Sequence, residues 1–245
     1  MKRSFAGLTD TGLVRSVNQD AFYIDDPDGR FFIVADGMGG HAGGQEASRI
    51  ATKTIEQYLD EHWASSETTP ALLEEAFFKA NQAIVQDQIE HPERADMGTT
   101  AVAVVFREDK PWCAHVGDSR LYLLRGDRLE QITEDHTWVG RALKAGHLSL
   151  EDARNHPWRH VLSQCLGRED LQQVDVQQID VQGGDRFLLC SDGLTEELSA
   201  EEIASRLTSQ LSGEEAAREL VKAAKNNGGR DNITVAIVTL EDTAK

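Results

Sequence analysis

The stretch Phe31-Phe32-Ile33-Val34-Ala35-Asp36-Gly37 joins an entirely apolar run to an acidic residue and a glycine. The same pattern recurs as FLLCSDG at 187–193 and, in reverse order, as DNITV at 231–235. Short apolar runs bounded by turn residues are typical of buried strands, so each aspartate is expected at the rim of a core. A carboxylate in that position loses part of its hydration, which is tolerated when it is paired or bound to a cation. The three stretches therefore predict a cation site assembled from strand ends.

Composition and charge exclude several classes of protein. The 245-residue chain is 40% hydrophobic, enough to bury a substantial core. Its 25 basic and 42 acidic residues give a net charge of −17, which repels nucleic acid and anionic membranes. The sequence has neither a signal-peptide pattern nor a membrane-spanning run, so we expect a cytoplasmic protein without a nucleic-acid or membrane partner. The three cysteines lack metal-site spacing and are expected to be buried.

The hydrophobic patterns predict blocks of strands alternating with pairs of helices. Strands are expected at 21–24, 31–35, 99–106, 112–116, 121–124, 174–181, 187–190 and 233–240. Helices are expected at 45–59, after Thr69-Pro70, at 200–207 and at 214–225. A mixed segment at 133–170, with helical pieces at 139–145 and 150–155, is expected to be a flap insertion. This order favours two central sheets with helices outside them over a doubly wound parallel sheet.

Six short motifs occur in an order that is specific as a set. They are RSVNQD at 15–20, DGMGG at 36–40, MGTT at 97–100, GDSR at 117–120, CSDGL at 190–194 and RDNIT at 230–234. In this order they resemble the metal-dependent protein phosphatase family, type 2C, in its compact bacterial form. The resemblance implies a single catalytic domain over residues 1–245 with an α+β fold. That fold is a four-layer α-β-β-α sandwich of two mainly antiparallel sheets flanked by helix pairs.

The resemblance also implies hydrolysis of phosphoserine and phosphothreonine monoesters. Such a reaction needs positive charge on the phosphoryl oxygens and a nucleophile at neutral pH. Two divalent ions about 3.5–4 Å apart can supply both, through direct attack of a water or hydroxide that bridges them. Oxygen ligands suit Mn²⁺ or Mg²⁺ rather than zinc. We therefore expect two Mn²⁺ or Mg²⁺ ions, with a third in bacterial members of the family.

The metal ligands are carried over motif by motif. Asp36 resembles the carboxylate that bridges both ions, and the carbonyl of Gly37 resembles a ligand of the second ion. Asp192 and Asp231 resemble the other ligands of the first ion, and Asp118 resembles the residue that holds a third ion together with Asp192. Any one Asp-Gly pair is equally well interpreted as a turn. The joint pattern favours metal binding.

Two more residues are expected to act on substrate and water. Arg15 resembles the guanidinium that receives the substrate phosphate, for which its planar fork of donors is suited. Asp20 resembles a carboxylate that orients metal-bound water. A surface ion pair for Arg15 and a solvated strand-edge charge for Asp20 are the alternative interpretations.

Met38 departs from the family pattern. Eukaryotic members commonly have a histidine there as the proposed proton donor to the leaving group, and methionine cannot donate a proton. His41, three residues further along the glycine-rich turn, is one candidate for this role, and metal-bound water is the other.

Two other functions compete with this hypothesis. Ser119 could be a nucleophile of an acyl hydrolase, but no G-x-S-x-G elbow surrounds it. A catalytically inactive phosphoprotein-binding module is the second alternative, and the retained aspartates favour an enzyme over it. The family implies phosphorylated protein substrates, an opposing serine/threonine kinase and action as a monomer.

Overall fold

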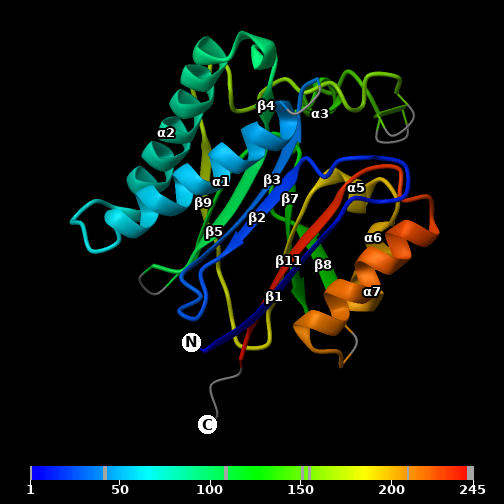
Figure 1. Ribbon diagram of the computed structural model, residues 1–245. Helices are drawn as coiled ribbons and strands as arrows, with labels where there is room; N and C mark the ends of the chain where they lie inside the picture. The colour runs from blue at the N-terminus through cyan, green and yellow to red at the C-terminus, as the bar shows by residue number, and fades with distance from the viewer. Residues whose placement is uncertain are drawn as a thin grey trace.

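The fold consists of two stacked antiparallel sheets, each covered on its outer face by helices (Figure 1). The computed structural model describes residues 2–40, 43–107, 110–149, 152–153, 156–208 and 210–241. The architecture confirms the α+β sandwich predicted from the sequence. In the described helices, none combines the length and apolarity needed to cross a bilayer.

Two sheets, each named here after one of its inner strands, form the middle of the sandwich. The β11 sheet has the order β1-β11-β10-β7-β8, made of Arg3–Asp10, Ile233–Leu240, Arg186–Cys190, Arg120–Arg125 and Arg128–Gln131. The β3 sheet has the order β2-β3-β5-β6-β9, made of Asp20–Ile24, Phe31–Met38, Ala101–Val105, Trp112–Val116 and Asp175–Gln178. A short strand, β4 (Gly98–Thr99), pairs with the end of β3.

Helix pairs form the outer layers. Helices α1 (Gly43–Glu61) and α2 (Thr69–Glu90) cover the β3 sheet, and a 3-10 turn, η1 (Pro92–Arg94), follows α2. Helices α6 (Ala200–Leu207) and α7 (Gly213–Asn226) cover the β11 sheet, and each begins with a serine capping box. Two shorter helices are α3 (Trp138–Lys144) in the flap and α5 (Asp192–Thr195) directly after β10.

Strand β3 shows why the apolar run at 31–35 carries no alternation of polar residues. Successive side chains of a strand point to opposite faces, and both faces of this strand are covered. Phe31 and Ile33 belong to the core beneath α1 and α2, whereas Phe32 and Val34 belong to the core between the sheets. Continuing this alternation places Asp36 on the side that faces the other sheet.

Several elements differ from the sequence prediction. Strands β1 and β8 and helix α5 were not predicted, because most side chains of β1 and β8 are only half-buried or exposed and α5 is a single turn. The predicted strand at 99–106 is two strands. It is interrupted at Thr100, whose backbone N–H donates to the carbonyl of Asp36 and whose hydroxyl accepts from the Asp36 N–H. The predicted flap helix at 150–155 falls largely outside the described residues.

The flap connects β8 to β9 and is joined to the sandwich at its base. Leu166 joins it to the sandwich through a β-bridge with Thr99 of β4, and Thr137 forms a second β-bridge with Leu162 inside the flap. Helix α3 confirms the helical piece predicted at 139–145, within a residue at each end.

Candidate metal centre

The four aspartates predicted to bind metal gather at one end of the sandwich. Asp36 lies in β3, Asp192 is the first residue of α5, and Asp231 directly precedes β11. Asp118 lies in the turn between β6 and β7, where the chain crosses from the β3 sheet to the β11 sheet. The two sheets therefore bring together carboxylates separated by up to 195 positions in the sequence, from Asp36 to Asp231.

The buried carboxylates of this group repel one another, as their raised pKa values indicate. Burial raises the pKa of Asp36 well above its usual range, and repulsion from three neighbouring carboxylates, Asp20, Asp192 and Asp118, raises it further. Burial and the charge of Asp192 raise the pKa of Asp118 to about 8. Burial and Asp231 also raise the pKa of Asp192, whose carboxyl group shares a hydrogen bond with that of Asp36. A divalent cation would remove this repulsion, so the residues present fit a metal site.

Asp20 is held so that one carboxylate oxygen remains available. Its Oδ2 accepts hydrogen bonds from Ser191 Oγ at 2.7 Å and from Thr234 Oγ1 at 2.6 Å, both from the opposite sheet. Its Oδ1 is buried and has no hydrogen-bond partner among the described residues. Burial raises the pKa of Asp20 to about 7. An unpartnered buried carboxylate oxygen fits an acceptor for a metal-bound water, and it contradicts the alternative of a solvated charge.

The Thr234 hydroxyl is part of a chain of donors that ends at Asp20. Its single proton goes to Asp20, so the 2.7 Å contact with Thr9 Oγ1 is donated by Thr9. Thr9 in turn accepts from Asn18 Nδ2 at 2.8 Å. This chain, together with Ser191, fixes the carboxylate of Asp20 by contacts that the motifs did not reveal, although Ser191 and Thr234 lie within the motifs themselves.

Gly37 is confined by close contacts that only a glycine permits. A Cβ atom at this position would lie 1.9 Å from the carbonyl oxygen of Gly44 in α1. The N–H of Gly37 donates to the carbonyl of Gln19 at 3.1 Å. Thr99 Oγ1 also donates to the Asp36 carbonyl at 2.8 Å. The backbone that presents Asp36 and Gly37 is thus held on both sides.

Arg15 extends from the loop at 11–19, termed the Arg15 loop, toward the acidic group. Its Nη2 donates to Asp231 Oδ2 at 2.7 Å, and this hydrogen bond raises the pKa of the guanidinium. The amide of Asn232 holds the loop by donating to the carbonyls of Thr11 and Val17, both at 3.0 Å. The structure therefore contains the ion pair considered as an alternative. It also places an exposed guanidinium beside the predicted metal ligands.

Neither His41 nor the position of Met38 identifies the proton donor. His41 lies outside the described residues. Met38 is half-buried at the end of β3, where it pairs with Gly98 of β4. The role of His41 therefore stays a prediction.

One histidine near the centre was not predicted as a site residue. His160 of the flap contacts the carboxylate of Glu196 through Nδ1, and both side chains lie close to Asp192. Burial and the charge of Asp192 raise the pKa of Glu196 to about 7. The sequence could not reveal this contact, because it depends on how the flap folds back over α5.

A second group of metal-type side chains, His115, His136 and Asp175, does not fit a metal ion. His136 Nδ1 accepts from the N–H of Gly117 at 3.1 Å, so the neutral ring carries its proton on Nε2, 3.3 Å from Asp175 Oδ2. The two imidazole rings also stack at 4.5 Å with 25° between their planes, so their in-plane lone pairs do not converge. We interpret the group as a hydrogen-bonded support for the turn that carries Asp118.

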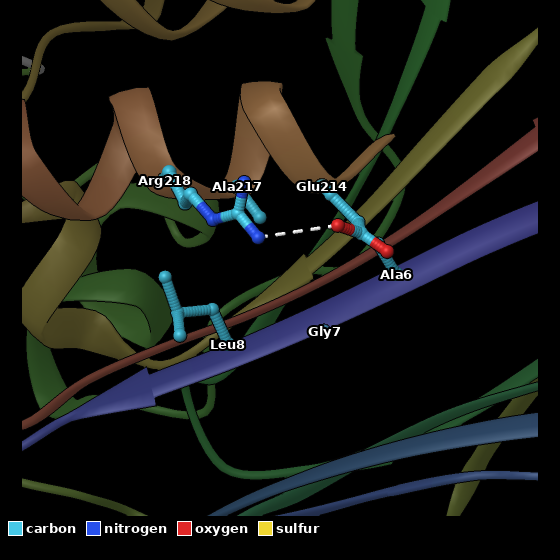
Figure 2. Close-up of a pocket in the computed structure, with 6 residues that line it drawn as sticks. All are labelled: Ala6, Gly7, Leu8, Glu214, Ala217 and Arg218. Carbon is cyan, nitrogen blue, oxygen red and sulfur yellow. Dashed lines mark hydrogen bonds and ion pairs between the residues drawn. The ribbon is translucent and has the colours of Figure 1, made fainter. Parts of the chain in front are cut away.

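A hollow of about 280 Å³ lies elsewhere, between β1 and α7 (Figure 2). Glu214 and Arg218 line it from α7 and form an ion pair with each other at 3.2 Å. Its other lining residues are small or aliphatic: Ala6, Gly7, Leu8 and Ala217. It is separate from the acidic group and supplies none of the groups expected for catalysis.

Comparisons with known proteins agree with this geometry. The family model described as Protein phosphatase 2C matches residues 14–225. The serine/threonine protein phosphatase PstP of Mycobacterium tuberculosis is 36% identical over 97% of this chain, which spans only 45% of that relative's length. The serine/threonine phosphatase Stp of Listeria monocytogenes is 37% identical over 97% of this chain and 96% of its own length.

Solved structures give the same result for the fold. The crystal structure of M. tuberculosis PstP superposes with a TM-score of 0.90 at 36% identity, covering 98% of this chain and 99% of that one. The catalytic domain of a PstP with two manganese ions superposes with a TM-score of 0.87 at 33% identity, covering 98% and 99% of the two chains. Motif order, sandwich architecture, clustered aspartates and these similarities lead to one conclusion: the chain belongs to the protein phosphatase 2C family.

Proposed function

We propose that this protein hydrolyses phosphoserine and phosphothreonine monoesters of proteins, using Mn²⁺ or Mg²⁺. In this proposal Asp36, the carbonyl of Gly37, Asp192 and Asp231 hold two ions, and Asp118 holds a third together with Asp192. When bound, the ions supply positive charge at the phosphoryl oxygens and a hydroxide nucleophile at neutral pH. The observation that carries the proposal is the convergence of buried carboxylates with raised pKa values around the unpartnered Oδ1 of Asp20.

Side chains of this chain have distinct tasks in the reaction. Arg15, beside Asp231, binds the phosphoryl oxygens through its planar fork of donors. Asp20 Oδ1 accepts a hydrogen bond from the attacking water and so orients it. Thr99 and Thr100 hold the backbone of Asp36, so that its carboxylate does not have to reorganise during turnover.

Hydrolysis of an aryl phosphate in the presence of Mn²⁺ or of EDTA tests this proposal. We expect activity with Mn²⁺ and none with EDTA, and loss of activity in Asp36→Asn and Asp192→Ala. Asp127→Asn, in the exposed turn between β7 and β8, is the matched control and should retain wild-type rates. Full activity in EDTA or in both site variants would contradict the two-metal mechanism.

The same assay separates the enzyme from an inactive phosphoprotein-binding module. A module would bind phosphopeptides but leave their phosphate in place at every Mn²⁺ concentration. Ser119 is an unsuitable nucleophile, because it is buried and its hydroxyl shares a 2.6 Å hydrogen bond with Thr100. An opposing kinase, action as a monomer and a cytoplasmic location complete the proposal and rest on the resemblance and the sequence pattern.

A further inference from the structure

The exposed apolar side chains of this protein are concentrated beside the metal centre. Of the seven large apolar side chains exposed in the described residues, six lie on the Arg15 loop or the flap, and the seventh is Ile89 of α2. The six, termed the apolar rim, are Leu13, Val14, Val17, Trp138, Trp158 and Val161. Scattered exposed apolar residues need no explanation, whereas their collection on two segments that border one site does.

Both segments of the rim are attached to the acidic group. On one side Arg15 donates to Asp231 at 2.7 Å, with Val14 68% exposed next to it in the chain. On the other side His160, adjacent to Val161, contacts Glu196 one turn after Asp192. Figure 1 shows the Arg15 loop, in blue, and the flap with α3 at the same end of the sandwich. Apolar side chains therefore lie on two segments that each contact the acidic group.

The flap part of the rim has a fixed shape. Trp138 and Trp158 pack edge to face with ring centroids 5.2 Å apart, and Trp138 also stacks on His156 at 4.9 Å. The N–H of Trp138 donates to the carbonyl of Val161 at 2.8 Å, which holds Val161 beside the tryptophans. Rigid aromatic side chains lose little conformational entropy on binding, which makes them effective contacts for a partner.

We propose that the apolar rim docks the residues of the substrate that flank the phosphorylated residue, and that it selects segments with a large apolar side chain and without acidic neighbours. This inference rests on the proposed function. A phosphoryl group that reaches Arg15 and the aspartates must bring its flanking residues across the rim. Alternate side chains of an extended segment point to the same face, so one flanking side chain can meet the rim.

The negative charge of the chain favours substrate segments without acidic residues. The chain carries a net charge of −17, and both rim segments contact carboxylates, Asp231 through Arg15 and Glu196 through His160. An acidic flank would be repelled there, whereas an apolar flank gains from covering exposed tryptophan and valine side chains.

Two matched sets of phosphothreonine peptides test the inference. One set carries a tryptophan placed in turn at each flanking position, and the other carries glutamine or glutamate at the same positions. With the wild-type protein and Mn²⁺ we expect kcat/KM to be about tenfold higher for the best tryptophan peptide than for its glutamine counterpart, and lower still for glutamate. Equal rates for all peptides would overturn the docking inference, and hydrolysis of none of them would instead overturn the proposed function.

Variants of the rim locate the effect. Trp158→Ser and Val14→Ser should each reduce the preference for the tryptophan peptide toward a ratio of one, and Trp158→Phe should keep most of it. Ile89→Ser removes an equally exposed apolar side chain that belongs to neither the Arg15 loop nor the flap, so its preference ratio should equal that of the wild type. Val14 lies on a different segment from the flap, so a flap distorted by Trp158→Ser leaves the test intact. A preference unchanged in both serine variants would contradict the inference.

A second copy of this chain is the competing occupant of the rim. Sedimentation of the wild type should give a monomer over the concentrations used in the assay. A dimer that dissociates in Trp158→Ser or Val14→Ser but not in Ile89→Ser would assign the rim to self-association and overturn the substrate-docking inference.

Discussion

Asp20 and Asp36 lie directly opposite each other in the antiparallel pair of β2 and β3. Like charges in cross-strand pairs repel, and here both carboxyl groups are also buried. This arrangement is destabilising in the absence of a bound cation. The protein therefore retains an unfavourable pair at the position where metal binding is proposed.

The stability of the metal-free protein should decrease as pH rises. The pKa values of Asp20 and Asp118 are raised to about 7 and about 8, whereas an unfolded aspartate titrates near 4. Between these values the folded state binds more protons than the unfolded state, so the free energy of unfolding falls as pH increases. We expect the melting temperature in EDTA to fall between about pH 5 and about pH 8, and Mn²⁺ to restore it at the upper end. A flat or rising profile in EDTA would rule out these pKa shifts.

Asp36→Asn should separate stability from activity. Burial and neighbouring carboxylates raise the pKa of Asp36 well above its usual range, so replacing it relieves repulsion, and the melting temperature of the metal-free variant at pH 8 should exceed that of the wild type. Asp36 is a metal ligand in the proposed function, so its loss should reduce kcat by about 10³-fold, which corresponds to a transition-state cost of about 4 kcal/mol. Calorimetry and aryl phosphate turnover check the two effects, with Asp127→Asn as the control. A variant less stable than the wild type in EDTA would argue against electrostatic repulsion at this site.

Thr234→Val should weaken metal binding without removing any metal ligand. The substitution keeps the shape of the side chain but removes one of the two hydroxyl groups that donate to Asp20 Oδ2, so that Ser191 alone remains. Loss of such an orienting contact typically reduces metal affinity 10- to 100-fold, so we expect about a tenfold rise in the Mn²⁺ concentration needed for half-maximal activity. Thr234→Ser restores the hydroxyl and should restore the affinity. If the serine and valine variants behave alike, the hydroxyl has no role in positioning Asp20.

Arg15→Ala should impair substrate binding more than metal binding. Charge-assisted hydrogen bonds contribute about 1.5–3 kcal/mol, which corresponds to a reduction of kcat/KM by roughly 10- to 100-fold. Arg15→Lys should recover only part of this loss, because an ammonium group lacks the planar fork. Steady-state kinetics with an aryl phosphate over a range of Mn²⁺ concentrations distinguishes an effect on substrate binding from an effect on metal binding. An unchanged KM at saturating Mn²⁺ would leave Arg15 with only its ion pair to Asp231.

Gly37→Ala should destabilise the fold at the metal centre. The new methyl group would lie 1.9 Å from the carbonyl oxygen of Gly44, so β3 and α1 would have to separate. Overpacking of this kind costs about 1–3 kcal/mol, measurable by urea unfolding in EDTA. Gly126→Ala is the control for placing alanine at a glycine with space around it, although its positive φ adds strain of its own. Equal stability of Gly37→Ala and the wild type would show that α1 can move away from β3.

The sequence predicted the centre better than its surroundings. Asp36, Asp192 and Asp231 adjoin apolar runs, and a run buried on both faces can be recognised without knowing its neighbours. Strand β1 was missed because most of its side chains are half-buried and include charged and polar residues. His160 was missed because its contact with Glu196 is set by tertiary folding of the flap and not by any local pattern.

The positions of Ser191 and Thr234 were within reach of simple reasoning about strands. Ser191 directly precedes Asp192, and Thr234 lies two residues after Asn232. Both alternate with side chains of the core beneath α6 and α7, such as Cys190 and Val235. Alternation therefore directs their hydroxyls toward the opposite sheet, where Asp20 lies. What the alternation cannot provide is the distance between the two sheets, and therefore whether the hydroxyls reach the carboxylate.

The acidic residues are divided between the two sheets, so the centre links one sheet to the other. Asp20 and Asp36 belong to one sheet, Asp192 and Asp231 adjoin strands of the other, and Asp118 lies on the crossing between them. A cation held by both halves would fasten them together, so neither half could retain partial function after the other unfolds. Phosphatase activity would then require the whole sandwich to be assembled. A chain in which one sheet is cleaved or unfolded would have no activity, and not merely a reduced rate.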